Sequence, residues 1–284
     1  MTSARVRRLA HAAVVSVAPG VGGRWATNVF SRTRTFGGRP DDVVPLGARE
    51  FAVDGNPDVR RGYLWGDGEG PTALLVHGWG ADSSSMHSLV RPLRELGFTV
   101  AAFDAPAHGI NPGTTATMTQ YTAAVAAVLR TLGTVRVMVA HSLGSVAAVS
   151  GATEAGTDLD CVAMIAPTCT LSGVLERWAP TDMWVTRPVV ERIYRELHER
   201  NGVPVSHWDV RTRGGGITCP ILAMHDPHDP LVPYGDAEAI ATALPDVRLV
   251  PAPGRGHLAI LMAPEVKDEV SAFVAKHGWR EGKK

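Results

Sequence analysis

Residues 137–148 read VMVAHSLGSVAA and contain the pattern that decides the fold. A run rich in β-branched residues leads into AHSLG (140–144) and then into a helical stretch of small residues. A sharp strand-to-helix turn exposes the hydroxyl of its central serine, and it needs small residues two positions before and after that serine. Ala140 and Gly144 meet this requirement, so the pattern predicts Ser142 as a nucleophile. A serine that only caps a helix is the alternative.

Short β-rich runs alternate with helical patterns around this turn, from about residue 48 to the end of the chain. This alternation predicts an α/β fold with a mostly parallel eight-stranded sheet and helices on both faces. The first two strands look antiparallel, and the carboxyl ends of the parallel strands meet at one edge, where ligands bind. The expected strands are FAVDG (51–55), RRGYLWG (60–66), ALLVHG (73–78), FTVAAFD (98–104), VRVMVAHS (135–142), CVAMIAP (161–167), PILAMHD (220–226) and VRLVPAPG (247–254). Helices are expected over 84–97, 118–133, from 142, 234–244 and 263–278.

Residues 168–216 interrupt the alternation with two helical patterns. Since structureless loops of about 50 residues are rare, we expect a helical cap inserted between the core segments 46–167 and 217–284. In its second helix Val190, Ile193 and Leu197 mark one apolar face. The cap is rich in large side chains, which favours an apolar pocket. These are Trp178, Met183, Trp184, Tyr194 and Trp208.

The N-terminal part of the chain is basic. Residues 1–40 contain seven arginines and no acid, around the apolar stretch LAHAAVVSVAPGVGG (9–23). His11 and Pro19 interrupt this stretch, and no clean cleavage site follows it, which argues against a signal peptide. We therefore expect a basic leader helix or extension over residues 1–45, packed on the domain and able to make weak contact with a membrane surface. The predicted location is cytoplasmic, with a secreted or membrane-associated protein as the alternative.

Overall composition excludes several classes of protein. The chain has 284 residues, and its 28 Lys and Arg balance 28 Asp and Glu, so no net field attracts nucleic acid. The three cysteines, Cys161, Cys169 and Cys219, are odd in number and form no CxxC pair. They argue against a disulfide framework or structural zinc site, and for a reducing compartment.

A serine nucleophile needs a histidine base, and the base needs an orienting carboxylate. In a turn of this kind the three follow one another in the order serine, acid, histidine. Asp229 lies just past the strand expected over 220–226, and His257 lies between the last strand and the last helix. The order and the shared sheet edge predict Ser142, Asp229 and His257 as a catalytic triad.

The stretch AMHDPHDPLVP (223–233) also raises the question of a metal site. His225, Asp226, His228 and Asp229 offer suitable ligand atoms, but a metal needs three or four convergent ligands. Two prolines stiffen this turn, and the remaining ligands would have to come from distant segments. We therefore expect no metal, and the two histidines become loop-packing residues.

A glycine-rich stretch, HGWG (77–80), follows another buried strand. The loop after this strand supplies one oxyanion donor, and the residue after the nucleophile supplies the other. These donors are predicted to be the backbone N–H groups of Trp79 and Leu143. The expected supporting residues, which shape the turn without acting as bases, are His77, Gly78, Gly80, His141 and Gly144, and His108 in FDAPAHGIN is a further turn residue.

The motifs LLVHGWG, FDAPAHG, VAHSLG, HDPHDPLVP and GRGHLAIL, in this order, resemble the α/β-hydrolase superfamily over about residues 48–278. They are similar in particular to a group of largely uncharacterised bacterial serine α/β hydrolases. The resemblance implies an α/β-hydrolase fold in which Ser142 is the nucleophile and His257 the base. It also implies Asp229 rather than Asp226 as the acid, since Asp229 precedes Val232-Pro233 by three residues as in the family pattern.

The function expected from these residues is that of a serine hydrolase without a cofactor. Its substrate would be a small apolar carboxylic ester, thioester or lactone, cleaved through an acyl-serine intermediate. The oligomeric state stays open. Alternatives on the same scaffold are an acyltransferase, a cofactor-free haloperoxidase, a lyase, or a non-catalytic protein that binds a small molecule. A dehalogenase or epoxide hydrolase would normally have aspartate in place of Ser142.

Overall fold

The structure is a computed structural model that describes residues 19–33, 42–68, 70–179 and 187–278. Parts of the predicted leader (1–18 and 34–41) and of the predicted cap (Met183 and Trp184) lie outside these ranges. No helix in the described ranges combines the length and the hydropathy that a membrane span requires.

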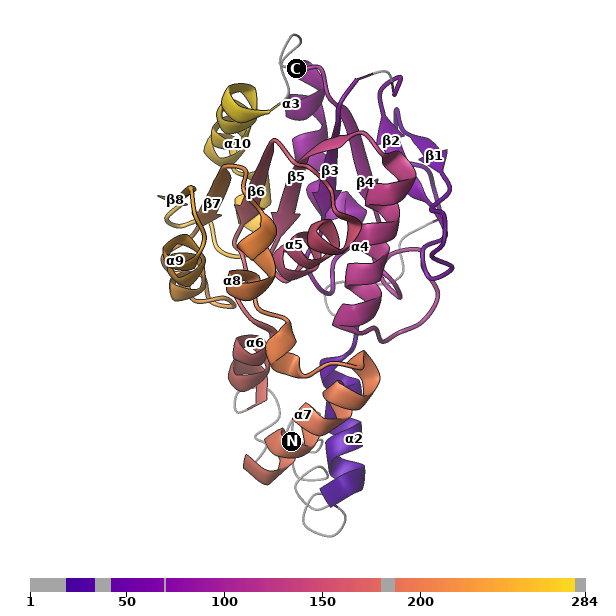
Figure 1. Ribbon diagram of the computed structural model, residues 1–284, viewed down its shortest axis with the longest axis vertical. Helices are drawn as coiled ribbons and strands as arrows, with labels where there is room; N and C mark the ends of the chain where they lie inside the picture. The colour runs from indigo at the N-terminus through magenta and orange to yellow at the C-terminus, as the bar shows by residue number, and fades with distance from the viewer. Residues whose placement is uncertain (1–18, 34–41, 69, 180–186, 279–284) are drawn as a thin grey trace, which may run out of the picture.

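Eight strands form one sheet in the order β1-β2-β4-β3-β5-β6-β7-β8 (Figure 1). Strand β2 pairs antiparallel with β1 and β4, and all other pairs are parallel. The predicted mostly parallel eight-stranded sheet with an antiparallel start is therefore confirmed. The strands are β1 (Arg49–Phe51), β2 (Gly62–Trp65), β3 (Thr72–Val76), β4 (Thr99–Phe103), β5 (Val135–His141), β6 (Cys161–Ile165), β7 (Ile221–His225) and β8 (Val247–Pro251).

The inner strands are buried on both faces, which explains their continuous apolar sequences. Every residue of β3, β4, β6 and β7 is buried. Along β3, Leu74 belongs to the core on the side of α4 and α5, whereas Leu75 belongs to the core on the side of α3 and α10. Helices thus cover both faces of the sheet (Figure 1). Their bounds are α3 (Val90–Glu95), α4 (Met118–Leu132), α5 (Gly144–Ala155), α8 (Val210–Arg213), α9 (Tyr234–Ala243) and α10 (Pro264–His277), with short 3₁₀ helices η1 (Ser83–Leu89), η3 (Val205–His207), η4 (Gly214–Gly216) and η5 (Ala259–Met262).

The segment 84–97 differs from the single helix expected from its sequence. It divides into the 3₁₀ helix η1, which Asp82 caps by accepting a hydrogen bond from the Ser84 amide, and the α-helix α3. Pro92 explains the division, because proline has no N–H to donate and is tolerated only in the first turn of an α-helix. The helix after the serine also starts later than expected, at Gly144.

Three helices project beyond the carboxyl ends of the strands, at the lower end of Figure 1: α2 (Pro19–Phe30), α6 (Leu171–Trp178) and α7 (Arg187–Asn201). We call them the helical layer. Helix α7 buries Val189, Ile193, Leu197 and Asn201 at a spacing of four residues. The predicted apolar face is thus confirmed at Ile193 and Leu197, whereas Val190 is only partly buried and Val189 takes its place. Two adjacent valines fit either register of an apolar stripe, and packing selects Val189.

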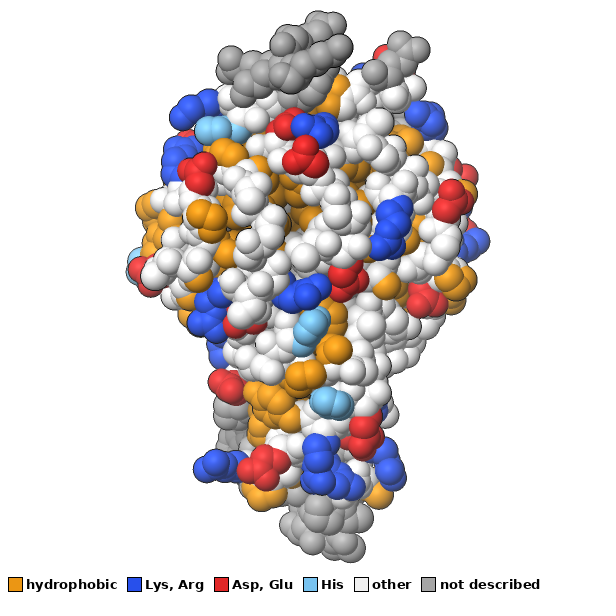
Figure 2. Space-filling model, viewed as in Figure 1, with side chains coloured by type: hydrophobic (Ala, Val, Ile, Leu, Met, Phe, Trp, Pro, Cys, Tyr) orange, Lys and Arg blue, Asp and Glu red, His pale blue; other side chains and the backbone are white. Residues whose placement is uncertain are grey.

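Helix α2 packs closely on α7. A Cβ atom added at Gly23 would lie 2.3 Å from Cγ of Arg192, so only glycine allows this approach. The rings of Phe30 in α2 and Trp178 in α6 meet edge to face at 5.1 Å. Figure 2 shows hydrophobic side chains along the narrow part where the helical layer joins the sheet, and charged side chains below it.

Candidate active site

The serine turn (residues 140–144) joins β5 to α5 in a strained conformation. Ser142 has a φ of 53°, in the left-handed region that residues with a side chain rarely adopt. Backbone hydrogen bonds hold it there: its N–H donates to the Ile165 carbonyl at 3.0 Å, and its carbonyl accepts from Ser145 and Thr168 at 3.0 and 3.2 Å. The side chain therefore stands at the carboxyl edge of the sheet with 8% of Ser142 exposed.

The loop after β3 lies directly against the serine turn. A Cβ atom on Gly144 would lie 2.1 Å from the His77 carbonyl oxygen, and one on Gly78 would lie 2.8 Å from Nδ1 of His141. These two positions must therefore be glycine. Tyr121 in α4 donates its hydroxyl to the same His77 carbonyl at 2.5 Å. No pattern around Tyr121 in the sequence indicates this role.

The His77 side chain holds the loop rather than taking part in proton transfer. Its Nε2 accepts from the Ala105 N–H at 3.0 Å, so Nδ1 carries the proton and donates to the Gly78 carbonyl at 2.7 Å. Burial lowers the pKa of His77. Next to it, Asp104 accepts from the Ser83 and Ile110 amides at 2.8 and 3.0 Å and so shapes the following loop.

The two predicted oxyanion donors, the backbone N–H groups of Trp79 and Leu143, lie on the loop after β3 and on the serine turn. Within the described residues, neither the Trp79 nor the Leu143 backbone N–H donates a hydrogen bond. Gly80 has a φ of 80°, which turns the chain at the end of this loop. The Trp79 indole donates to the Arg32 carbonyl at 2.8 Å, so the segment after α2 contacts this loop. No sequence pattern indicated that contact.

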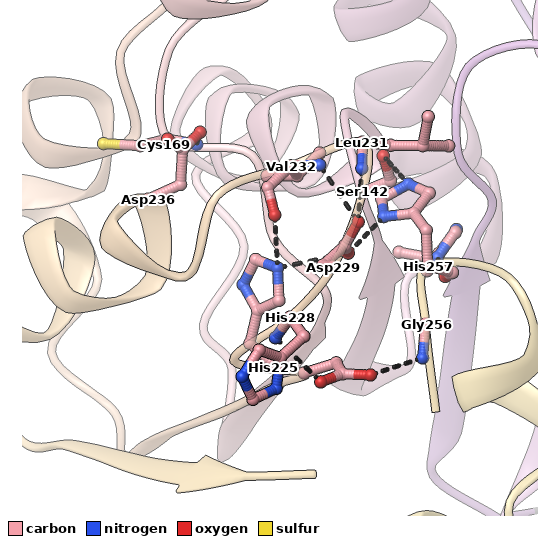
Figure 3. Close-up of polar contacts among 12 residues, drawn as sticks. Ser142, Cys169, His225, His228, Asp229, Leu231, Val232, Asp236, Gly256 and His257 are labelled. Carbon is pink, nitrogen blue, oxygen red and sulfur yellow. Dashed lines mark hydrogen bonds and ion pairs between the residues drawn. The ribbon is translucent and has the colours of Figure 1, made fainter. Parts of the chain in front are cut away.

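The structure brings Ser142, His257 and Asp229 into one hydrogen-bonded chain (Figure 3). Nδ1 of His257 donates to Oδ2 of Asp229 at 2.7 Å, so its Nε2 is the acceptor for the Ser142 hydroxyl at 2.8 Å. The three residues follow β5, β7 and β8, whose carboxyl ends share one edge of the sheet. This arrangement can remove a proton from the serine and stabilise the resulting imidazolium.

Asp229 belongs to the acid turn (residues 225–233), and its side chain is fully buried. Oδ1 accepts from the Leu231 and Val232 amides at 2.8 and 3.0 Å. Burial alone would raise the pKa of this carboxyl, but hydrogen bonds from His225, His257 and the two amides outweigh it. The pKa of Asp229 therefore lies well below its ordinary value, and the group is an anion.

Asp226, three residues earlier, faces backbone groups only. Its Oδ1 accepts from the His228 amide at 2.9 Å, and its Oδ2 accepts from the Gly256 amide at 2.6 Å. These bonds tie the acid turn to the loop that carries His257, and they lower the pKa of Asp226. Within the described ranges no three His, Cys, Asp or Glu side chains converge as metal ligands.

Two further histidines pack at this site: His141 contacts His257, and His108 contacts the loop after β3. Nε2 of His141 donates to the His257 carbonyl at 2.9 Å and so holds the backbone of His257. Burial, reinforced by the nearby His257, lowers the pKa of His141 to about 3, so the ring is neutral. The ring of His108 packs against those of His77 and Trp79, at 5.2 and 5.0 Å, and its Nδ1 is bonded to the Pro106 carbonyl.

Comparison with known proteins places the fold. A sequence model of the alpha/beta hydrolase family matches residues 73–269. An esterase of Pyrococcus furiosus is similar in structure, with a TM-score of 0.63, 18% identity, and coverage of 87% of this chain and 97% of its own. Est1E of Butyrivibrio proteoclasticus, with ferulic acid bound, has a TM-score of 0.62, 19% identity, and coverage of 81% and 99%.

A third similar structure is Est816, described as an N-acyl homoserine lactone degrading enzyme. It has a TM-score of 0.59 and 18% identity, and the alignment covers 80% of this chain and all of that one. At such identities the similarity concerns the fold alone. No curated protein matches the sequence.

Proposed function

Since this chain belongs to the alpha/beta hydrolase family, we propose that it is a serine hydrolase. Its substrate is a small apolar carboxylic ester, thioester or lactone, which it cleaves through an acyl-serine intermediate. The observation that carries the proposal is the chain of two hydrogen bonds from Ser142 through His257 to Asp229, at 2.8 and 2.7 Å. A serine is otherwise a weak nucleophile at neutral pH.

The proposed reaction has two similar halves. His257 takes the proton of Ser142 as the serine oxygen attacks the carbonyl carbon, and then gives it to the leaving alcohol or thiol. A water molecule, deprotonated by the same histidine, attacks the acyl-serine and releases the acid. Asp229 keeps the imidazole in the tautomer with the proton on Nδ1 and stabilises its protonated form.

The oxyanion of each tetrahedral intermediate would be bound by the amides of Trp79 and Leu143. Loss of one such donor typically raises the barrier by about 3 kcal/mol. Support for this assignment comes from Gly78 and Gly144, which allow the Trp79 loop and the serine turn to meet. Neither amide donates a hydrogen bond elsewhere within the described residues, so both are available as donors.

For the substrate, we propose that residues 168–216 act as a cap and supply an apolar binding surface. The partly buried aromatic side chains of the helical layer include Phe30, Trp178 and Tyr194. On the side of the triad, Leu231 and Leu258 follow the acid and the base and are 50% and 41% exposed. Apolar surface near the reacting groups favours an apolar acyl or alkyl group.

Hydrolysis of p-nitrophenyl esters of graded chain length, together with thioesters and lactones, tests the proposal. Activity should be present in the native protein and fall by about 10⁴-fold or more in Ser142→Ala. A fluorophosphonate should label Ser142 and no other residue. Unchanged hydrolysis in Ser142→Ala would refute the mechanism, whereas binding of esters without turnover would favour the non-catalytic alternative. Transfer of the acyl group to an added alcohol in preference to water would favour the acyltransferase alternative.

A further inference from the structure

Asp229 has a second imidazole partner besides the base. His225, the last residue of β7, places Nε2 at 3.2 Å from Oδ2 of Asp229, the same oxygen that His257 contacts at 2.7 Å (Figure 3). Both the His225 and the Asp229 side chains are fully buried. The pattern HDPHD offered no sign of this contact, and His225 was expected only to pack the loop.

The surroundings of His225 determine which of its nitrogens is protonated. Nε2 faces two acceptors, Oδ2 of Asp229 at 3.2 Å and the Val232 carbonyl at 3.0 Å. Neither oxygen can donate, so the hydrogen must lie on Nε2. Nδ1 of His225 is buried and has no hydrogen-bond partner among the described residues. His225 is therefore a donor to the carboxylate.

We propose that His225 is a positioning residue of the serine hydrolase proposed above, on which this inference rests. Its Nε2–H holds Oδ2 of Asp229 toward His257 and draws negative charge from that oxygen. The backbone amides already fix Oδ1, so the two donors to Oδ2, His257 and His225, together determine how the carboxylate is turned. Less charge on Oδ2 means that Asp229 stabilises protonated His257 less strongly than it would without the His225 donor.

The other titratable groups near this contact are few within the described residues. His141 at the end of β5 has its ring 4.9 Å from that of His257. Tyr234 at the start of α9 has its ring 5.8 Å from that of His225. Asp226 in the acid turn bonds backbone amides only. None of these donates to Oδ2 of Asp229, so removal of His225 leaves that oxygen with one partner.

The test compares His225→Phe, which removes the donor, with His225→Gln, which keeps an N–H at a similar reach. His228→Gln is the matched control, because His228 is exposed and only its backbone contacts an acid. In His225→Phe the acid limb of kcat/KM should move up by about half a pH unit or more, with kcat reduced and KM little changed. His225→Gln should recover most of this shift, and His228→Gln should match the native protein.

Proton NMR provides a measurement that does not need turnover. The low-field signal of the proton between His257 and Asp229, identified by its loss in His257→Gln, should move further downfield in His225→Phe. Nitrogen-15 shifts of the native protein should show His225 protonated on Nε2. The proposal is overturned if the ring proton of His225 is on Nδ1 alone. It is also overturned if a folded His225→Phe variant keeps the native acid limb of kcat/KM and the native position of the low-field signal. Absence of esterase activity in the native protein would refute the proposed function but leave the NMR test intact.

Discussion

The serine turn and the acid turn deliver neighbouring groups to the same site, but they are held by different kinds of contact. Ser142 is fixed by steric fit and backbone hydrogen bonds, with glycine required at position 144. The acid turn is fixed by charged side chains, since Asp226 and Asp229 each accept hydrogen bonds from two backbone amides. We therefore expect the serine turn to be disrupted by a larger side chain at position 144. We expect the acid turn to lose its function when the charge of Asp229 is removed.

The largest expected effect is a difference in kcat between variants of the two carboxylates of the acid turn, Asp229 and Asp226. Asp229→Asn should lower kcat by about 10⁴-fold with little change in KM, because an amide cannot stabilise the imidazolium and favours the wrong tautomer of His257. Asp226→Asn keeps an acceptor for the backbone and should lower kcat by about tenfold or less. Steady-state kinetics on one p-nitrophenyl ester compares the two variants. Equal losses would mean that the roles of the two acids are not distinct.

Added volume is the corresponding test of the serine turn. Gly144→Ala should destabilise the protein by about 3 kcal/mol and reduce activity, because the new methyl group meets the fixed His77 carbonyl. Gly215→Ala is the control, since nothing lies within 4 Å of its added Cβ, and it should stay within about 0.5 kcal/mol of the native protein. Urea unfolding measures both. Equal stability of the two variants would contradict the predicted clash between a Cβ atom at position 144 and the His77 carbonyl.

As pH falls, the free energy of unfolding should decrease first through His141 of the serine turn and then through Asp229 of the acid turn. The pKa of His141 is lowered to about 3, so the unfolded chain binds a proton that the folded chain does not between pH 6.5 and 3. Stability is thus lost as pH falls through this window, with a slope of up to about 1.4 kcal/mol per pH unit. The lowered pKa of Asp229 stabilises the fold above the ordinary carboxyl pKa of about 4, and this contribution is lost only below it.

Free energies of unfolding at a series of pH values, measured for the native protein, His141→Gln and Asp229→Asn, resolve the two windows. His141→Gln should flatten the curve between pH 6.5 and about 4. Asp229→Asn should leave that part intact and flatten only the part below about pH 4. Identical curves for both variants would contradict the assignment of separate windows.

The smallest expected effect concerns Leu231, the exposed leucine of the acid turn. Leu231→Ser should lower kcat/KM by about fivefold for long-chain esters and leave acetate esters unchanged, because an apolar contact gains energy only from a long acyl chain. Leu46→Ser is the control, since Leu46 is 99% exposed and lies before β1. A chain-length profile shows whether the acid turn also contacts substrate. Loss at every chain length would point to a disturbed Asp229 instead.

Much of the sheet could be predicted because its evidence is local. Fully buried strands such as β3 and β7 are continuous apolar runs, and the serine turn is defined by small residues at fixed positions around Ser142. Contacts between distant segments were not predictable in this way. Nothing in the sequence around Arg192 indicates that Gly23 packs on it, and nothing around Trp79 indicates its bond to Arg32.

The acid turn shows the same limit at shorter range. Asp229 could be chosen from its position in a recognised motif, but the donation from His225 depends on how the turn folds back over four residues. Likewise, Val189 and Val190 are equivalent in an amphipathic pattern, and only the packed structure distinguishes them. Side-chain direction within a turn or stripe is decided by tertiary packing, which the order of residues does not specify.

The contact of α2 with α7 has a practical consequence for protein engineering. The basic, apolar beginning of this chain invites removal to improve expression, and residues 1–33 would be the obvious piece to delete. Pro19–Phe30 packs on α7, and the Arg32 carbonyl accepts from the Trp79 indole beside a proposed oxyanion donor. A truncation that keeps the enzyme intact should therefore end before Pro19.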